Sequence, residues 1–344
     1  MIVGGIVMLL NGAVAAVPVD IAVTHAVAPF ITAYPWSSAG FGTKYANPST
    51  PLASIGYGVA FSPAGTEIAV GSQTTPWINA YLWSSAGFGT KFANPATLPG
   101  GLGNTVAFSQ AGTQIAVAHN VAPYISVYPW SGSGFGTRFA NPATPPTGQG
   151  QSVAFSPAGT EIAVAHNVSP FISAYPWSGS GFGTKFANPG TIPTQQGNSV
   201  AFSSAGTEIA LACTSTPTLL TYPWSASGFG TKFANPATLP GTRGNAVAFS
   251  LVGNYLAAGG SASPYIFVYP WSASGFGTKF ADPATIPPNP VVGVAFSKAG
   301  TEIAVAAQAT PWVLAYPWSG SGFGTKFANP GTLPTGIPNK VAFS

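Results

Sequence analysis

Residues 157–203 read PAGTEIAVAHNVSPFISAYPWSGSGFGTKFANPGTIPTQQGNSVAFS, and variants of this stretch fill residues 16–344 seven times. A tryptophan marks the repeat at a constant interval of 47 residues: Trp36, Trp83, Trp130, Trp177, Trp224, Trp271 and Trp318. The tetrapeptide VAFS keeps the same interval and ends the last copy at Ser344. Self-similarity at a fixed period of this length indicates a repeat architecture, so we expect one cooperative body rather than two domains.

Within the quoted copy, four short runs carry β-forming residues: 160–166, 170–177, 184–187 and 199–203. Clusters of Pro, Gly, Asn and Ser separate them, and none is long enough for a helix. Four short strands per repeat predict an all-β fold, a seven-bladed β-propeller of four-stranded blades. The first copy has no VAFS ahead of its strands, and the last VAFS, Val341–Ser344, has no strands after it. We therefore expect the C-terminal VAFS strand to complete the first blade and close the ring.

Charged residues are few, at 5% of the chain, and the repeat places most of them. One column of the repeat holds seven of the ten cations: Lys44, Lys91, Arg138, Lys185, Lys232, Lys279 and Lys326. Another holds five of the six acids: Asp20, Glu67, Glu161, Glu208 and Glu302. By strand order both columns lie at the same end of a blade, so pairs such as Glu67 with Lys91 are expected to interact partly. Regular rings of charge are unlike the basic track of a nucleic-acid binder, so no nucleic-acid partner is predicted.

Residues 1–15, MIVGGIVMLLNGAVA, precede the repeats and carry no charged side chain. We expect an apolar N-terminal arm that packs on this protein or on a neighbour. A signal peptide is the alternative, with small residues at Ala13 and Ala15 before the repeats. The run is too short and too rich in glycine for a membrane span, so none is predicted. Residues 16–344 then form the propeller.

The segments VAFSPAGTEIAVAHN and PFISAYPW resemble the WD-repeat class of β-propellers, whose blades begin on a similar inner strand. The usual Trp-Asp ending is Trp-Ser here, and the Gly-His pair with its partner Asp is absent, so the buried tetrad of that class is not carried over. Arrays with long connectors of the TLP type are similar to repeats in phage and bacterial surface proteins. The resemblance implies a phage virion component, such as a fibre, spike or capsid decoration, located in the virion or on an extracellular surface.

Comparison of the seven copies separates two kinds of loop. The turns SPAGT and WS-x-x-GFGTK barely change, whereas the connectors from the fourth strand to the next first strand differ in every copy. One aromatic column, which follows an unvarying proline, lies beside these variable loops and is predicted to bind a partner: Phe30, Trp77, Tyr124, Phe171, Tyr265 and Trp312, with Thr218 in the remaining copy. Plain packing beneath the loops is the alternative.

Groups for catalysis or metal binding do not converge in the sequence. The acids are spread about one per blade, so no catalytic residues and no enzyme are predicted. The histidines share one column, His25, His119 and His166, which Cys213 continues in the next blade. Ligands from successive blades are too far apart for one ion, so we predict satisfied polar residues and no metal. GSGFGTK lacks the ending of a phosphate loop, and no cofactor is expected.

These observations favour a non-enzymatic structural and adhesion propeller that binds a host-surface or virion partner through its variable loops. Two alternatives remain open: a multivalent carbohydrate-binding propeller lectin and a protein-interaction scaffold. The expected partners are other virion or surface proteins, with glycans and a homo-oligomer as further candidates.

Overall fold

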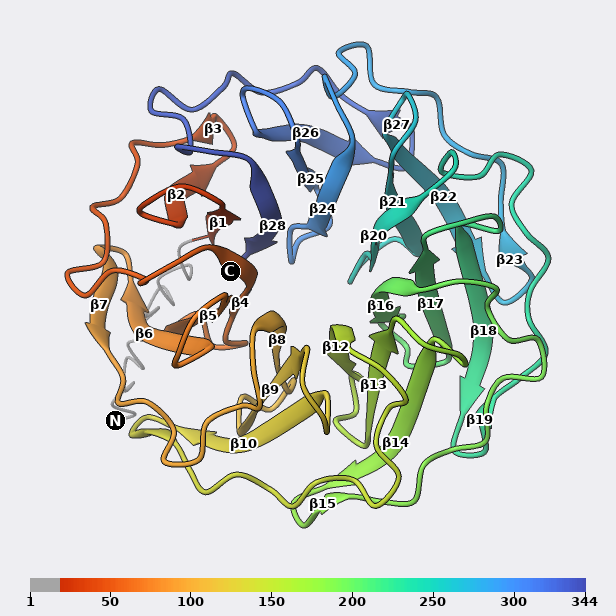
Figure 1. Cartoon of the computed structure of the whole chain (residues 1–344). Helices are drawn as coiled ribbons and strands as arrows, with labels where there is room; N and C mark the ends of the chain where they lie inside the picture. Colours follow the sequence, from red (N-terminus) through yellow and green to blue (C-terminus); the bar gives the residue numbers. More distant parts are fainter. Residues whose placement is uncertain (1–18) are drawn as a thin grey trace, which may run out of the picture.

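The computed structural model describes residues 19–344, which form a ring of seven sheets around a central opening (Figure 1). The predicted seven-bladed β-propeller is confirmed. The predicted N-terminal arm, residues 1–15, lies outside the described residues. Among residues 19–344, no helix has the length and apolar character needed to cross a membrane.

Each blade has four antiparallel strands, and the innermost strand lines the central opening. The innermost strands are β4 (Gly56–Phe61), β8 (Gly103–Phe108), β12 (Gly150–Phe155), β16 (Gly197–Phe202), β20 (Gly244–Phe249), β24 (Val291–Phe296) and β28 (Pro338–Phe343). The second strands are β1 (Val19–His25), β5 (Glu67–Ser72), β9 (Gln114–His119), β13 (Glu161–His166), β17 (Glu208–Cys213), β21 (Tyr255–Gly260) and β25 (Glu302–Ala307).

The two outer positions of each blade are filled in the same order. The third strands are β2 (Ile31–Ser37), β6 (Ile78–Ser84), β10 (Ile125–Ser131), β14 (Ile172–Ser178), β18 (Leu219–Ser225), β22 (Ile266–Ser272) and β26 (Val313–Ser319). The outermost strands are β3 (Gly40–Phe41), β7 (Gly87–Lys91), β11 (Gly134–Phe135), β15 (Gly181–Phe182), β19 (Gly228–Phe229), β23 (Gly275–Phe276) and β27 (Gly322–Phe323). Blade 1 consists of β28, β1, β2 and β3, and blades 2 to 7 follow along the chain.

The outermost strand is shorter than the sequence predicts. Residues 184–187 were expected to form it, but in that blade only β15 pairs with the third strand. The ladder stops at Pro176, which has no N–H to donate and only accepts, at 2.8 Å, from Gly183 N. Blade 2 has Leu82 at the position of that proline, and there β7 continues to Lys91. The proline therefore sets the length of the outer strand.

Blade 1 joins the two ends of the described chain, as predicted. β28 pairs antiparallel with β1, with Val341 opposite Val23. The hydroxyl of Ser344 accepts a hydrogen bond from Asp20 N at 2.8 Å, and Ser344 N donates to Asp20 O at 2.9 Å. Closure makes β1 an internal strand of its sheet, and β28 lines the channel like the other innermost strands.

The seam between blades 1 and 2 has a polar lock that the other seams lack. The buried carboxylate of Asp20 accepts from Trp83 Nε1 at 2.8 Å and from the Tyr45 hydroxyl at 2.7 Å. Burial raises the pKa of the Asp20 carboxyl, although both hydrogen bonds oppose the shift. The other six tryptophans of this column have a buried indole N–H without a partner: Trp36, Trp130, Trp177, Trp224, Trp271 and Trp318.

The lock can be transferred to the next seam. Glu67 and Phe92 occupy the positions of Asp20 and Tyr45 beside Trp130, and the Glu67 carboxylate accepts from Thr66 instead. We expect the double variant E67D/F92Y to give Trp130 Nε1 an acceptor and to raise the free energy of unfolding by about 1 kcal/mol. Chemical denaturation measures the change. The reverse pair, D20E/Y45F, is the matched control and should destabilise the ring. If both pairs shifted stability in the same direction, the lock would not be the cause.

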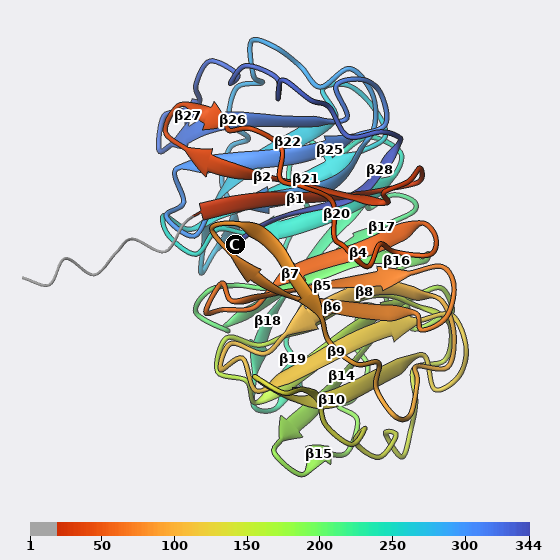
Figure 2. The ribbon, with the colours of Figure 1, turned by 90° about the vertical axis from the view of Figure 1, so that its left-hand side faces the viewer.

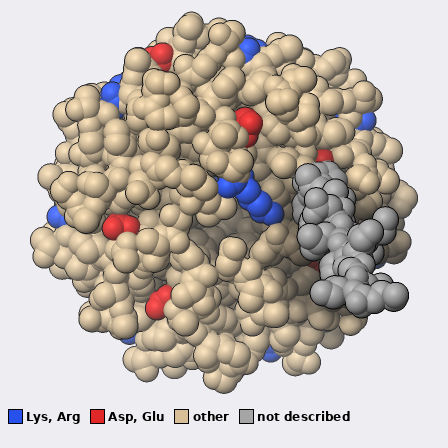
Figure 3. Space-filling view, turned by 180° about the vertical axis from the view of Figure 1, so that it is seen from behind, with Lys and Arg blue, Asp and Glu red and all other residues tan. Residues whose placement is uncertain are grey.

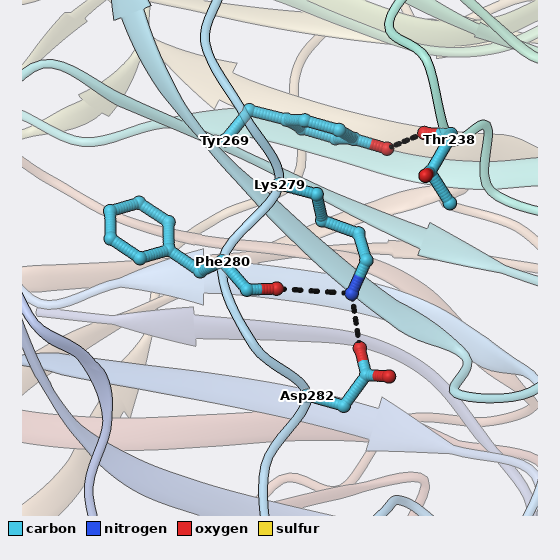
Figure 4. Close-up of polar contacts among 5 residues, drawn as sticks. All are labelled: Thr238, Tyr269, Lys279, Phe280 and Asp282. Atoms are coloured by element: carbon cyan, nitrogen blue, oxygen red, sulfur yellow. Dashed lines mark hydrogen bonds and ion pairs between the residues drawn. The ribbon is translucent and has the colours of Figure 1, made fainter.

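The cation column makes local contacts rather than pairs with the acid column. Lys91 Nζ donates to Asn94 Oδ1 at 2.6 Å, so the expected pairing with Glu67 is wrong. Within residues 19–344 the one ion pair joins Lys279 to Asp282, three residues along the same connector (Figure 4). Lys279 Nζ also donates to Phe280 O at 3.0 Å. In six of the seven blades the column thus fixes the connector that leaves the blade. Tyr269, whose hydroxyl donates to Thr238 O, holds the preceding connector in Figure 4.

Candidate functional site

The ring has two faces, which lie right and left in Figure 2. The loop face, on the right, carries the variable connectors that lead into each innermost strand. The turn face, on the left, carries the short turns that follow each innermost strand, such as residues 62–66. Every innermost strand runs from the loop face to the turn face, so successive columns along it line successive depths of the central channel.

The predicted partner-binding column lies on the loop face. All six rings are half-buried, and Thr218 in the seventh blade is fully buried. Each of the six residues follows a cis proline and has a positive φ, for example 64° at Trp77. Trp77 O accepts from Ser72 N at 3.0 Å and lies against Gly103 of the next blade, where a Cβ would come within 2.3 Å of it. The backbone of this column therefore packs the blades together, and partner binding by its rings stays a prediction.

The histidine column lies at the loop-face ends of the second strands. His25, His119 and His166 are fully buried, and each Nε2 contacts a hydroxyl of the third strand, at 2.9 to 3.0 Å. Burial lowers the pKa of all three to about 4, so they are neutral at pH 7. No group of three His, Cys, Asp or Glu within residues 19–344 is placed to hold a metal ion.

The central channel contains three successive cavities. At the loop face, a cavity of about 270 Å³ is lined by residues from all seven blades. Below it, a throat of about 130 Å³ is again lined by all seven blades, through small side chains and valines. Towards the turn face, phenylalanines of four blades border a cavity of about 350 Å³. Figure 3 shows the turn face, hollowed at its centre and with few charged side chains elsewhere. None of the six partner-binding candidates lines these cavities.

Side-chain amides form the loop-face mouth of the channel. Asn104, Asn198, Asn245 and Asn339 each donate from Nδ2 to a backbone carbonyl of the next blade's innermost strand, at 2.7 to 3.1 Å. Because one amide hydrogen is held by the neighbouring blade, the orientation of each side chain is fixed. The second N–H and the oxygen of an amide can then contact a hydroxyl-rich ligand.

The throat is built from small residues with one exception. Its column reads Gly58, Thr105, Ser152, Ser199, Ala246, Gly293 and Lys340 from blade 2 round to blade 1. A Cβ on Gly58 would lie 2.5 Å from Thr105 Cα, because neighbouring innermost strands approach closely here. Lys340 therefore projects a long basic side chain into a passage that the other blades keep narrow. Burial lowers the pKa of its ammonium group to about 8.

Three hydroxyls surround the same depth of the channel. Thr105 Oγ1 accepts from Val153 N at 3.0 Å, and the Ser152 and Ser199 hydroxyls accept from backbone N–H groups at 3.2 Å. In each case the hydroxyl oxygen accepts its hydrogen bond from a backbone N–H of the next blade. The hydroxyl proton of each remains to be donated, which provides a set of fixed donors in the throat.

The cations outside the repeated column all lie along this channel. Arg243 lines the loop-face mouth and Lys340 the throat. Lys298 occupies the column that borders the turn-face cavity, and its Nζ donates to Pro63 O of blade 2 at 3.0 Å. Within the described part of the chain, residues 19–344, no acidic residue lines any of the three cavities. The sequence interpretation missed these residues because it followed the repeated columns; the cations that break the repeat were the available signal.

Comparisons with known proteins agree on the fold. No family model matches the chain, and no curated protein matches its sequence. Among solved structures, a candidate 6-phosphogluconolactonase from Bacteroides uniformis has a TM-score of 0.74 at 14% identity, covering 95% of this chain and 99% of that one. A similar protein from Bacteroides fragilis gives 0.73 at 13% identity, covering 97% and 100%. The periplasmic gluconolactonase of Pseudomonas aeruginosa gives 0.69 at 16% identity, covering 94% and 99%. The class defined by fold and channel is thus a seven-bladed propeller similar in structure to lactonases.

These comparisons correct the expected function. The three similar structures named above are described as lactonases and not as WD-repeat or phage proteins, so the resemblance is upheld only for the propeller. The prediction of a non-enzymatic phage adhesion module, with the lectin and scaffold as alternatives, is contradicted. The prediction of no enzyme is wrong on the same finding. A virion or extracellular location is contradicted as well, since the Pseudomonas protein is periplasmic.

The functional prediction was wrong because the motif it relied on is required by the fold. VAFSPAG encodes an innermost strand and its turn, which every blade of this kind needs, and so it carries no information on function. The expectations about nucleic acid, glycans and a homo-oligomer stay predictions.

Proposed function

We propose that the central channel is an active site that hydrolyses the lactone of a small, hydroxyl-rich acid. The observation that carries the proposal is Lys340, a single amine beside a layer of hydroxyl donors and beneath a ring of fixed amides. The lactonase descriptions of the similar structures support the choice of reaction. The mouth cavity, about 270 Å³, suits a molecule of the size of one sugar ring.

The electrostatics of the channel favour an anionic substrate. Arg243 and Lys340 line the mouth cavity and no carboxylate opposes them there. A carboxylate or phosphate on the substrate gains from both cations. The hydroxyls of the substrate can bind the amide groups of Asn104, Asn198 and their equivalents.

The residues of the throat supply the chemistry of ester hydrolysis. With its pKa near 8, the neutral amine of Lys340 can accept a proton from water as that water attacks the lactone carbonyl. The charge that develops on the carbonyl oxygen is stabilised by the hydroxyls of Thr105, Ser152 and Ser199. When the ring C–O bond breaks, the ammonium of Lys340 returns its proton to the leaving oxygen. One lactone and one water give one hydroxy acid, Lys340 ends in its starting protonation state, and there is no redox step.

Measuring lactone opening by NMR tests this proposal. Glucono-δ-lactone and its 6-phosphate are incubated with the protein, and the uncatalysed rate in the same buffer is subtracted. We expect K340M to lose at least about 100-fold of the catalysed rate, because a general base contributes about 10²–10⁴-fold. The rate of the parent should rise with pH and level off above about 8, where the amine is neutral.

The matched control is K326Q. Lys326 Nζ contacts Asn329 Oδ1 on a connector at the outside of its blade and is absent from the channel linings, so this variant should keep the parental rate. No catalysis above background with either lactone, or equal rates in K340M and the parent, would refute the proposed function.

A further inference from the structure

We propose that Lys340 is also a covalent-binding residue, whose amine condenses with small anionic aldehydes to form an imine in the throat. The inference concerns a binding chemistry beyond lactone hydrolysis and does not require it. It depends on the surroundings of one side chain in the innermost strand β28.

The amine has space and lacks a partner that would occupy it. Among residues 19–344, the polar contact of the amine is a single long one, 3.5 Å from Nζ to Val292 O. No carboxylate lines the throat or the mouth cavity, so no ion pair holds the amine in its protonated form. The mouth cavity opens directly above it, and the neighbouring positions of the column are Gly58 and Gly293, which add no side chain.

The lysines of the repeated column can be compared with Lys340. Other lysines, such as Lys185 and Lys232, contact an asparagine oxygen at 2.5 to 2.7 Å on their own connectors. Burial lowers the pKa of Lys340 to about 8, so about one molecule in ten carries the neutral amine at pH 7. An ordinary lysine, with a pKa near 10.4, has less than about one in a thousand. The nucleophilic form is thus more abundant at Lys340 than at an ordinary lysine.

The throat also has the groups that the condensation needs. The lone pair of Nζ attacks the aldehyde carbon, and one amine proton moves to the carbonyl oxygen to give a carbinolamine. The C–O bond then breaks, the oxygen leaves as water with the second amine proton, and the C=N bond forms. The hydroxyls of Thr105, Ser152 and Ser199 can donate to the departing oxygen, because each already accepts a backbone N–H and has its proton free. The sequence of steps balances without an oxidant or reductant.

The charge of the mouth selects the aldehyde. Arg243 lies at the entrance, and every residue that lines the mouth cavity is neutral or basic. A carboxylate attached to the aldehyde, as in glyoxylate, should therefore favour entry, while an uncharged aldehyde of similar size gains nothing from Arg243.

Reductive trapping tests the inference. The full-length protein is incubated at pH 7 with glyoxylate and cyanoborohydride, and the modified lysines are located by peptide mass spectrometry. We expect Lys340 to be modified at least about ten-fold faster than Lys326, whose Nζ donates to Phe327 O and Asn329 Oδ1. Acetaldehyde should show a smaller preference for Lys340, and R243Q should reduce the preference for glyoxylate.

Two variants make the result decisive. K340R keeps a positive charge but cannot form an imine, so it should remove the fast adduct while its thermal melting shows that the ring is folded. K326Q should leave the adduct at Lys340 unchanged. Uniform modification of all lysines, or a fast adduct that persists in K340R, would overturn the inference. Lactone hydrolysis is measured without aldehyde or reductant, so failure of either proposal is distinguishable from failure of the other.

Discussion

A chain that lacks Val341–Ser344 is expected to lose most of its stability. The deletion removes the C-terminal half of β28, including Val341, which is 6% exposed, and Phe343, whose ring packs on Trp36 at 5.5 Å. Burial of two such side chains contributes about 3–6 kcal/mol, and the loss also exposes β1 as an open sheet edge. A whole domain is stabilised by only about 5–15 kcal/mol, so we expect a large fall in melting temperature together with aggregation.

The control for the deletion is the single variant F343A, which keeps the strand but removes its ring. It should lower the melting temperature by less than the deletion does. A truncated protein that melts like the parent would show that pairing of β28 with β1 does not stabilise the ring.

Acid should unfold the protein through its histidines. His25, His119 and His166 have a pKa of about 4 when folded and about 6.5 when unfolded. Between these values the unfolded chain binds more protons, so stability is complete above about pH 6.5 and falls as the pH decreases towards 4. Each residue accounts for about 3 kcal/mol over this window, and three together approach the stability of a whole domain.

Denaturant melts at several pH values measure this effect. The triple variant H25Q/H119Q/H166Q keeps polar side chains but removes the titration, so its stability should change far less between pH 7 and pH 4.5, even if it is lower at pH 7. Asp20 acts in the opposite direction, because its pKa is raised by burial and it favours the folded state as the pH falls. A triple variant with the same pH dependence as the parent would show that other groups control acid stability.

The architecture could be predicted from the sequence because the repeat period sets the number of blades. The interval between tryptophans predicted seven blades, and the register of VAFS predicted that β28 pairs with β1; both are confirmed. The outermost strand was predicted at residues 184–187 and is observed, shorter, at Gly181–Phe182, because β-forming residues were counted without considering the strand they pair with. Pro176 lies in the third strand and ends its pairing with the outermost strand. Blade 2 has Leu82 at the same position and a longer outermost strand, which shows that the proline is the cause.

The candidate site was not found from the sequence for a related reason. Variation among copies was interpreted as a sign of function, and the longest variation lies in the surface connectors, whose sequences vary more than those of the strands they join. Lys340 is one substitution in a column of small residues, and its importance depends on where the seven innermost strands converge. That convergence is a property of the closed ring, which no single repeat contains.

The position of the channel on the ring axis fixes how many ligands the protein can hold. Sites on the blades or in the seams would occur in multiples, up to seven per molecule, and their occupancy would report avidity. A site on the axis exists once, however many repeats surround it. Because one of its seven equivalent positions holds a lysine, the site is not symmetric about the axis. Calorimetry of the purified chain with an axial ligand should therefore give a binding stoichiometry of one.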